Sequence, residues 1–128
     1  MPRTILTFLT IIIDNESYDC RAAHQQYSIR YINFELNKKN KISINDIFQK
    51  SLLPKVENIC KQKFKKQYDK SDDEVNEFHL PKSFAILRNG VLFHFQPYEM
   101  GSFAEGDMTI FLPYSEVYGL LQNNLINK

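Results

Sequence analysis

The stretch Gly90–Val117, GVLFHFQPYEMGSFAEGDMTIFLPYSEV, decides the fold. Both of its ends alternate between apolar and other side chains with the period of two that β-strands show, at Val91–Phe95 and at residues 107–113. Its middle does not alternate and holds Gly101 and Gly106, whose backbones reach conformations closed to other residues. The pattern predicts two strands joined by a loop that its own aromatic side chains hold in order, in the manner of an Ω-loop.

Proline and aromatic residues define these two strands. Pro97 ends the first strand, because proline cannot donate to a sheet ladder, and Pro113 closes the second. Phe93 and Phe95 share one face and are expected in the core. His94 lies on the opposite face, so we expect a partly exposed strand residue there rather than a metal ligand.

The flanking residues extend this pattern. Ser83–Leu87 predicts a further strand, and the Asn89–Gly90 pair suits positive φ, so a tight turn is expected to join it to the next strand as a hairpin. At the other end, Tyr114–Leu125 predicts a short C-terminal helix with Ser115 as its N-cap.

The longest predicted helix is Ser51–Tyr68, with Ser51 as its N-cap and Pro54 in its first turn, where a missing N–H costs nothing. Its apolar residues recur at three- and four-residue spacings and form a stripe that is expected to pack on a sheet. They are Leu52, Leu53, Val56, Ile59, Cys60, Phe64 and Tyr68. The basic run Lys61–Lys66 is expected to be the solvated side of this helix rather than a phosphate-binding face.

The N-terminal half adds two strands. Ile5–Ile13 is the first, Asp14–Ser17 has the composition of a turn, and the alternating residues 25–36 form the second. Residues 37–41 are a polar reversal, and Asn45 is expected to cap a brief helical turn. Because strands outnumber helices and come in hairpins, we expect an α+β fold in which one long amphipathic helix and the short C-terminal helix accompany an antiparallel sheet.

Length and composition indicate one globular domain, residues 1–128, with 43% hydrophobic and 24% charged residues. A net charge of +1 predicts no whole-domain attraction to nucleic acid. The run Ile5–Ile13 has the length of a signal-peptide core, but its threonines, β-branched residues and lack of a cleavage site favour a strand. It is too short to insert through a membrane. A strand this close to Met1 suggests a domain excised from a longer protein.

Catalytic and metal-binding signals are weak. His24, His79 and His94 have no metal-ligand spacing, so no metal or cofactor is expected. Cys60 is expected to be buried, and a disulfide with Cys20 stays open as an alternative.

Carboxylates gather in the predicted loop, as Glu99, Glu105 and Asp107. Such side chains in glycine loops are mostly solvated or bound to nearby N–H groups, so we expect no catalysis. The rival hypothesis is an enzyme that acts through Glu99, Glu105 or His94.

Two segments resemble a known family, the lysozyme-sensing anti-sigma-V type C-terminal domain. The first is NGVLFHFQPYEMGSFAEGDMTIFLPYSEV, and the matching residues are Gly90, Phe93, Phe95, Pro97, Tyr98, Glu99, Ala104, Gly106, Pro113, Tyr114 and Ser115. The second is NFELNKKNKISINDIF, with Asp46 and Phe48 at matching places.

This resemblance implies an α+β domain at the cell envelope. Some members bind lysozyme, and others accompany polysaccharide deacetylase domains. We therefore expect a non-catalytic, extracytoplasmic binding or sensing module for a lysozyme-like protein or a cell-wall glycan. The alternative is an accessory domain of, or a weak enzyme in, peptidoglycan or polysaccharide modification. The expected ligand-binding residues are Tyr98, Glu99, Phe103 and Glu105, unless the loop aromatics belong to the core. The oligomeric state stays open.

Overall fold

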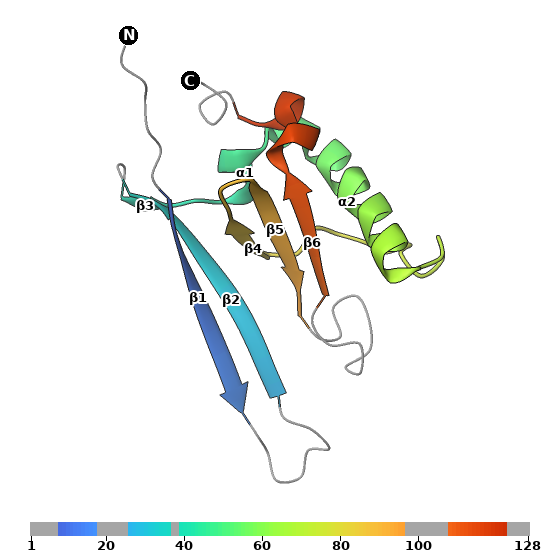
Figure 1. Cartoon of the computed structure of the whole chain (residues 1–128), viewed down its shortest axis with the longest axis horizontal. Coiled ribbons are helices and arrows are strands. Elements are labelled where there is room, and N and C mark those ends of the chain that lie inside the picture. Colours follow the sequence, from blue (N-terminus) through green and yellow to red (C-terminus); the bar gives the residue numbers. More distant parts are fainter. Residues whose placement is uncertain (1–7, 18–25, 37–38, 97–107, 123–128) are drawn as a thin grey trace.

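In the described residues, six strands form two three-stranded antiparallel sheets (Figure 1). The structure is a computed structural model that describes residues 8–17, 26–36, 39–96 and 108–122. The first sheet has the order β1-β2-β3, with β1 at Phe8–Ser17, β2 at Gln26–Glu35 and β3 at Asn40–Lys41. The second has the order β4-β5-β6, with β4 at Ser83–Ile86, β5 at Gly90–Phe95 and β6 at Met108–Pro113. The α+β class is confirmed, but the antiparallel sheet that the sequence predicts is divided in two.

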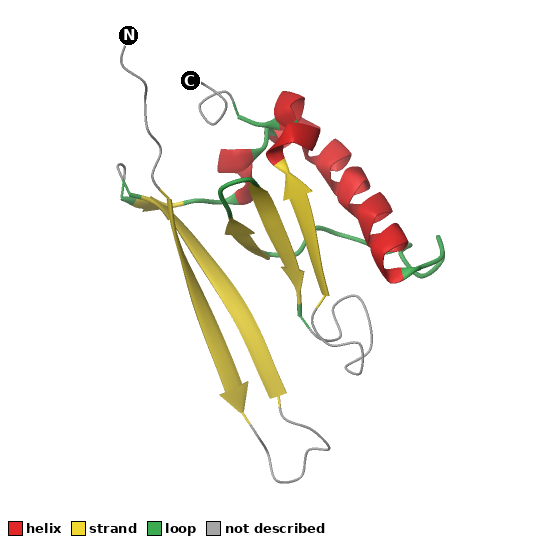
Figure 2. Ribbon diagram, in the orientation of Figure 1, coloured by secondary structure: helices red, strands yellow, loops and turns green. Residues whose placement is uncertain are grey.

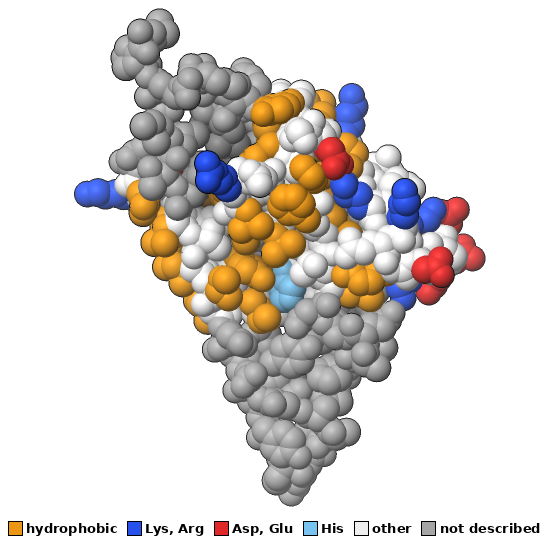
Figure 3. Space-filling model, viewed as in Figure 1, with side chains coloured by type: hydrophobic (Ala, Val, Ile, Leu, Met, Phe, Trp, Pro, Cys, Tyr) orange, Lys and Arg blue, Asp and Glu red, His pale blue; other side chains and the backbone are white. Residues whose placement is uncertain are grey.

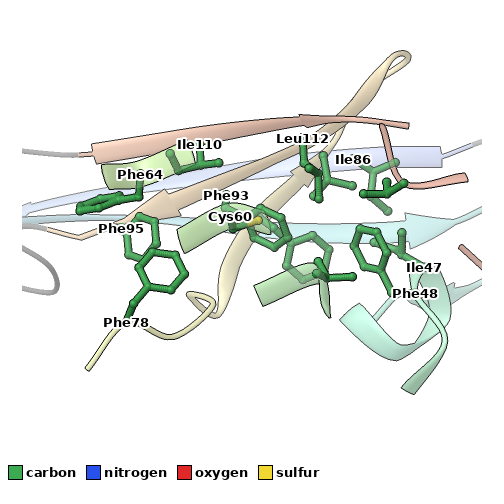
Figure 4. Close-up of a cluster of buried hydrophobic side chains, with 14 of the residues drawn as sticks. Ile47, Phe48, Cys60, Phe64, Phe78, Ile86, Phe93, Phe95, Ile110 and Leu112 are labelled. Carbon is green, nitrogen blue, oxygen red and sulfur yellow. The ribbon is translucent and has the colours of Figure 1, made fainter. Parts of the chain in front are cut away.

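The single long helix α2, Leu53–Tyr68, lies alongside the second sheet (Figure 2). Its buried residues Val56, Cys60 and Phe64 belong to one apolar core with the inward side chains of β4, β5 and β6 (Figure 4). The sheet contributes Phe84, Ile86, Val91, Phe93, Phe95, Met108, Ile110 and Leu112 to this core. The predicted stripe and the core positions of Phe93 and Phe95 are therefore confirmed.

Helix starts differ from the prediction by a few residues. A 3-10 turn at Lys50–Leu52 precedes α2, so Leu52 rather than Ser51 stands at its N-cap, while Pro54 lies in the first turn as predicted. The brief helix α1, Ile44–Ile47, is capped by Ser43, not Asn45.

The cap of α1 has a local cause. The Ser43 N–H donates to the Asp46 carboxylate at 2.8 Å, so an acidic side chain inside the first turn reaches back to the residue before the helix. The predicted C-terminal helix appears in the described residues as two 3-10 turns, Tyr114–Glu116 and Tyr118–Leu120, with Pro113 rather than Ser115 at the N-cap of the first.

The first hairpin is longer than its composition predicts. β1 continues through Asp14–Ser17, where a turn was expected, and pairs with β2 in one unbroken register from Phe8↔Glu35 to Ser17↔Gln26. The turn prediction at Asp14–Ser17 is wrong because the ladder to β2 outweighs the local preference of polar residues for turns. In the view of Figure 1 this hairpin diverges from the second sheet toward its lower end.

Side chains rather than a backbone ladder join the two sheets. The Asn33 amide on β2 donates to the Phe84 carbonyl of β4 at 2.9 Å and accepts from the Ile86 N–H at 3.1 Å. The Gln96 amide beyond β5 does the same for Ile29 of β2, accepting from its N–H at 3.0 Å and donating to its carbonyl. These two amides supply the hydrogen bonds that a neighbouring strand would otherwise supply.

His94 is buried, with only 2% of its surface exposed, so the expectation of partial exposure is wrong. It does lie on the face of β5 opposite Phe93 and Phe95, as predicted, but that face is covered from the first sheet. The Tyr31 ring meets the His94 ring edge-on at a centroid distance of 5.6 Å. The prediction failed because it counted one sheet face as free when the β1–β2 hairpin packs against it.

Gly90 serves packing, not backbone conformation. The predicted hairpin is present, with Ile86 opposite Val91, yet Asn89 is not among the residues with positive φ. A Cβ atom at Gly90 would lie 2.3 Å from the Leu112 carbonyl oxygen and 2.8 Å from the Pro113 Cα. Glycine is thus required because β6 approaches closely.

We expect Gly90→Ala to lower the free energy of unfolding by about 1–3 kcal/mol, since a backbone carbonyl must shift to admit the methyl group. Gly119→Ala is the matched control, because a Cβ there meets nothing within 4 Å. It should change the free energy by less than about 0.5 kcal/mol. Urea denaturation of both variants measures the difference, and equal stabilities would contradict the packing explanation.

Candidate functional site

A cavity of about 770 Å³ opens between β2, the start of α2 and the segment that leads into β4. Its walls come from residues 30–33 of β2, residues 41–44, the first turns of α2 and residues 79–84. Because the 30–33 wall and the 79–84 wall belong to different sheets, the cavity spans the place where the two sheets meet. Its volume falls in the range of pockets that hold small ligands.

The floor of the cavity is apolar. Ile42, Ile44, Leu53 and Leu80 line it and are partly buried against the hydrophobic core. The Phe84 side chain, which is almost fully buried, adds an aromatic ring to the lining. A ligand that enters would therefore cover the apolar edge of the core, which favours burial of an apolar ligand face.

The rim of the cavity is basic. Arg30, Lys41 and Lys82 are exposed around it, and among the described lining residues Glu57 is the one carboxylate. Glu57 already accepts a hydrogen bond from the Leu80 N–H at 3.3 Å. Three cations and one carboxylate give these lining residues a net positive charge, which attracts an anionic group to the mouth of the cavity.

Local sequence explains the wall at residues 79–84. The chain leaves α2 at Asp69, which adopts the left-handed conformation at φ 53° and ends the helix. Val75 and Phe78 then bury their side chains in the core, while most of their neighbours stay exposed. The connection after α2 is thus anchored at two apolar points, and it leads Pro81 and Lys82 to the cavity.

In the basic run Lys61–Lys66, two lysines pair with carboxylates. Lys63 pairs with Glu116 at 2.9 Å, and Lys65 pairs with Asp72. The hydrogen bond and charge of Lys65 lower the pKa of Asp72 below its ordinary value. Carboxylates thus neutralise part of the positive charge of this run, in agreement with the prediction of a solvated helix face.

The predicted ligand-binding residues Tyr98, Glu99, Phe103 and Glu105 lie outside the described residues. So do the motif residues Pro97, Gly101 and Gly106, together with Cys20 and His24. The structure therefore neither brings them together nor separates them.

The residues of the resemblance motif that the structure describes have structural roles. Gly90, Phe93 and Phe95 are buried, and Pro113 ends β6 opposite Gly90. The Tyr114 hydroxyl donates to the Leu87 carbonyl at 2.9 Å, and burial raises the pKa of Tyr114 to about 12, so it stays a proton donor. Ser115 is exposed and caps no α-helix.

Cys60 is a free, buried thiol in α2, as its place on the apolar stripe predicts. Burial raises its pKa to about 12, which keeps it protonated and poorly nucleophilic near neutral pH. Within residues 8–17, 26–36, 39–96 and 108–122, no cluster of three or more His, Cys, Asp or Glu side chains could hold a metal ion. In the same residues, no helix is long and apolar enough to cross a membrane.

Sequence reasoning missed the cavity. Its three cations are far apart in the chain and share no motif. One local signal was present, since Arg30 stands between Ile29 and Tyr31 and is the one basic residue of β2. The partners of Arg30 at the rim emerge only from the fold.

Three comparisons with known proteins place the chain among its relatives. The model of the family DUF3298, described as a protein of unknown function, matches residues 45–115. Two similar solved structures are DUF3298 family members, one from Bacteroides fragilis NCTC 9343 and one from Pseudomonas aeruginosa PAO1. No curated protein matches the chain.

The structural likeness covers nearly all of this chain. The Bacteroides protein superposes with a TM-score of 0.78 at 19% identity, over 93% of this chain and 50% of its own. The Pseudomonas protein gives a TM-score of 0.69 at 16% identity, over 93% of this chain and 58% of its own. The chain thus spans little more than half the length of either solved protein. At these identities the likeness concerns the fold, and neither description names a ligand or an activity.

Proposed function

Because the chain belongs to DUF3298, a family of unknown function, we propose its role from its own chemistry: a non-catalytic module that binds an amphipathic, anionic ligand. The observation that carries this proposal is the cavity between the two sheets, with its apolar floor and basic rim. Apolar contacts would supply affinity, and Arg30, Lys41 and Lys82 would select a ligand with carboxylate or phosphate groups.

Cell-wall glycan is the ligand class that this chemistry favours. Sugar rings present apolar faces, and peptidoglycan fragments carry carboxylates, on the peptide where it is attached and on the lactyl group where it is not, so one fragment could meet both the floor and the rim. The resemblance to lysozyme-sensing envelope domains supports the same extracytoplasmic setting and adds a lysozyme-like protein as the second candidate ligand. We propose that the module acts at the cell envelope.

Several described side chains support binding rather than catalysis. Cys60 is a buried, protonated thiol, and His94 is covered by Tyr31. The cavity carboxylate of Glu57 is already engaged by the Leu80 N–H. None of these groups stands ready as a nucleophile or general base at the cavity.

The test is a titration of the whole chain with soluble peptidoglycan fragments and, separately, with lysozyme, followed by calorimetry. Lys82→Glu reverses one rim charge and should weaken binding of the glycan fragment by about tenfold, the loss of one charged contact. Lys66→Glu makes the same charge change at an exposed position of α2 away from the cavity and should leave affinity within about twofold.

Other outcomes have defined meanings. If neither ligand binds at high micromolar concentration, the proposal loses both ligands. If binding weakens in Phe103→Ala or Glu105→Ala but not in Lys82→Glu, the site belongs to the segment 97–107 instead. Turnover of glycan substrate that disappears in an alanine variant of Glu99, Glu105 or His94 would establish the enzyme alternative.

A further inference from the structure

One edge of the first sheet has no partner in the described part of the chain. β1 is the terminal strand of the order β1-β2-β3 and pairs only with β2 there. A strand edge of this length presents a row of backbone donors and acceptors that another strand can bind.

The register identifies which groups face outward. On β2, Ile29 directs its N–H and carbonyl away from β1 to the Gln96 amide, and Asn33 directs its carbonyl away from β1 to the Ile42 N–H. In an antiparallel pair, the residue opposite such a position also directs its backbone groups outward. The residues opposite Asn33, Tyr31 and Ile29 are Thr10, Ile12 and Asp14. Their N–H and carbonyl groups therefore form the free edge.

The side chains along this edge are unusually apolar for an exposed strand. Leu9 is 45% exposed, Ile11 41% and Ile12 61%. Figure 3 shows hydrophobic side chains on this side of the molecule. From Phe8 to Ile13 the strand contains no charged residue and no proline, the two features that commonly protect an edge from pairing.

We propose that β1 is a self-association surface on which a second copy of this chain pairs through its own β1, antiparallel and about a two-fold axis that passes between the two Ile12 residues. An antiparallel edge is its own complement, because a two-fold rotation matches its donors with its acceptors. In this register Ile12 exchanges both hydrogen bonds with Ile12 of the second copy, and Thr10 does so with Asp14.

This register also suits the side chains. It places Ile12 beside Ile12 on one face and Ile11 beside Ile13 on the other, and the two strands overlap from Phe8 to Glu16. A shift of the axis to Ile13 would set Ile11 opposite Asn15 and Ile12 opposite Asp14, so aliphatic side chains would lose aliphatic partners. The uncharged middle of the strand brings no like charges together at the axis.

The experiment measures the mass of the whole chain by sedimentation over a range of concentration. The unmodified chain should shift from monomer to dimer as concentration rises. Ile12→Lys sets two lysines opposite each other and should raise the dimer dissociation constant by about tenfold or more. Leu87→Lys is the matched control, since Leu87 is 42% exposed but follows β4 in the other sheet, and it should dimerise like the unmodified chain.

Hydrogen exchange supplies a readout that needs no variant. The amides of Thr10 and Ile12 should become protected as concentration rises, whereas those of Leu9, Ile11 and Ile13, which bond to β2, should be protected at every concentration. A chain that stays monomeric to about 1 mM overturns the proposal. So does a dimer that Ile12→Lys leaves intact, or one in which the Thr10 and Ile12 amides exchange freely, because another surface would then make the contact.

Discussion

Replacing Phe64 with alanine is expected to lower the free energy of unfolding by about 3–5 kcal/mol, the cost of deleting a large buried aromatic ring. Phe64 is fully buried at the middle of an aromatic cluster, with ring centroids 4.9 Å from Tyr68, 5.4 Å from Phe95 and 5.6 Å from Phe78. The cavity left behind would touch α2, β5 and the connection after α2 together. Urea denaturation followed by circular dichroism gives the free energy.

Phe111→Ala is the matched control for this core prediction. It removes the same ring from β6, but Phe111 is 39% exposed on the face away from α2. We expect a loss of about 1 kcal/mol there. If both phenylalanine variants lost the same free energy, the core between α2 and the second sheet would not be the main source of stability.

Asn33→Ala is expected to lower the free energy of unfolding by about 2–4 kcal/mol. The substitution leaves the Ile86 N–H and the Phe84 carbonyl without their partner, and each unsatisfied buried group costs about 1–3 kcal/mol. Asn33 is itself almost fully buried, so water would replace the amide poorly. Chemical denaturation gives the total loss, and hydrogen exchange at the Ile86 amide locates it.

Thr10→Val provides the comparison for the Asn33 prediction. It removes the hydroxyl that donates to the Asn33 side chain at 2.7 Å and lies 3.5 Å from the Ile86 carbonyl oxygen, but it leaves the two bonds between Asn33 and β4 in place. The expected loss is about 0.5–1.5 kcal/mol, the net value of one hydrogen bond. An Asn33→Ala variant no less stable than Thr10→Val would show that the amide does not hold the sheets together.

The elements with strong periodicity were predictable from sequence. The apolar stripe of α2 repeats over several turns, and the strands on either side of Gly90 alternate clearly. The spacing of the buried residues was therefore enough to tell helix from strand. The local structure or burial of a residue was not predictable where it depends on a strand that is distant in the sequence. Asp14–Ser17 became strand because β2 continued beside it, and His94 became buried because Tyr31 covered it.

The candidate site was less predictable than the fold. The basic rim needs Arg30 from β2, Lys41 from β3 and Lys82 from the approach to β4, and no local pattern relates these residues. The two amides that join the sheets were equally hidden. Asn33 looked like an ordinary polar residue of a strand, and its role depends on the β4 edge that it meets.

The junction between β2 and β4 has a mechanical consequence. Two strands held by a continuous ladder resist force because many bonds must break at once, as they must between β1 and β2. The two sheets are joined by the Asn33 and Gln96 amides, by the Ser83 hydroxyl that donates to the Ile29 carbonyl and by the Tyr31–His94 ring contact, and these separate contacts can break one after the other under load. A ligand that bridges Arg30 on β2 and Lys82, which directly precedes β4, would add a further connection across this seam.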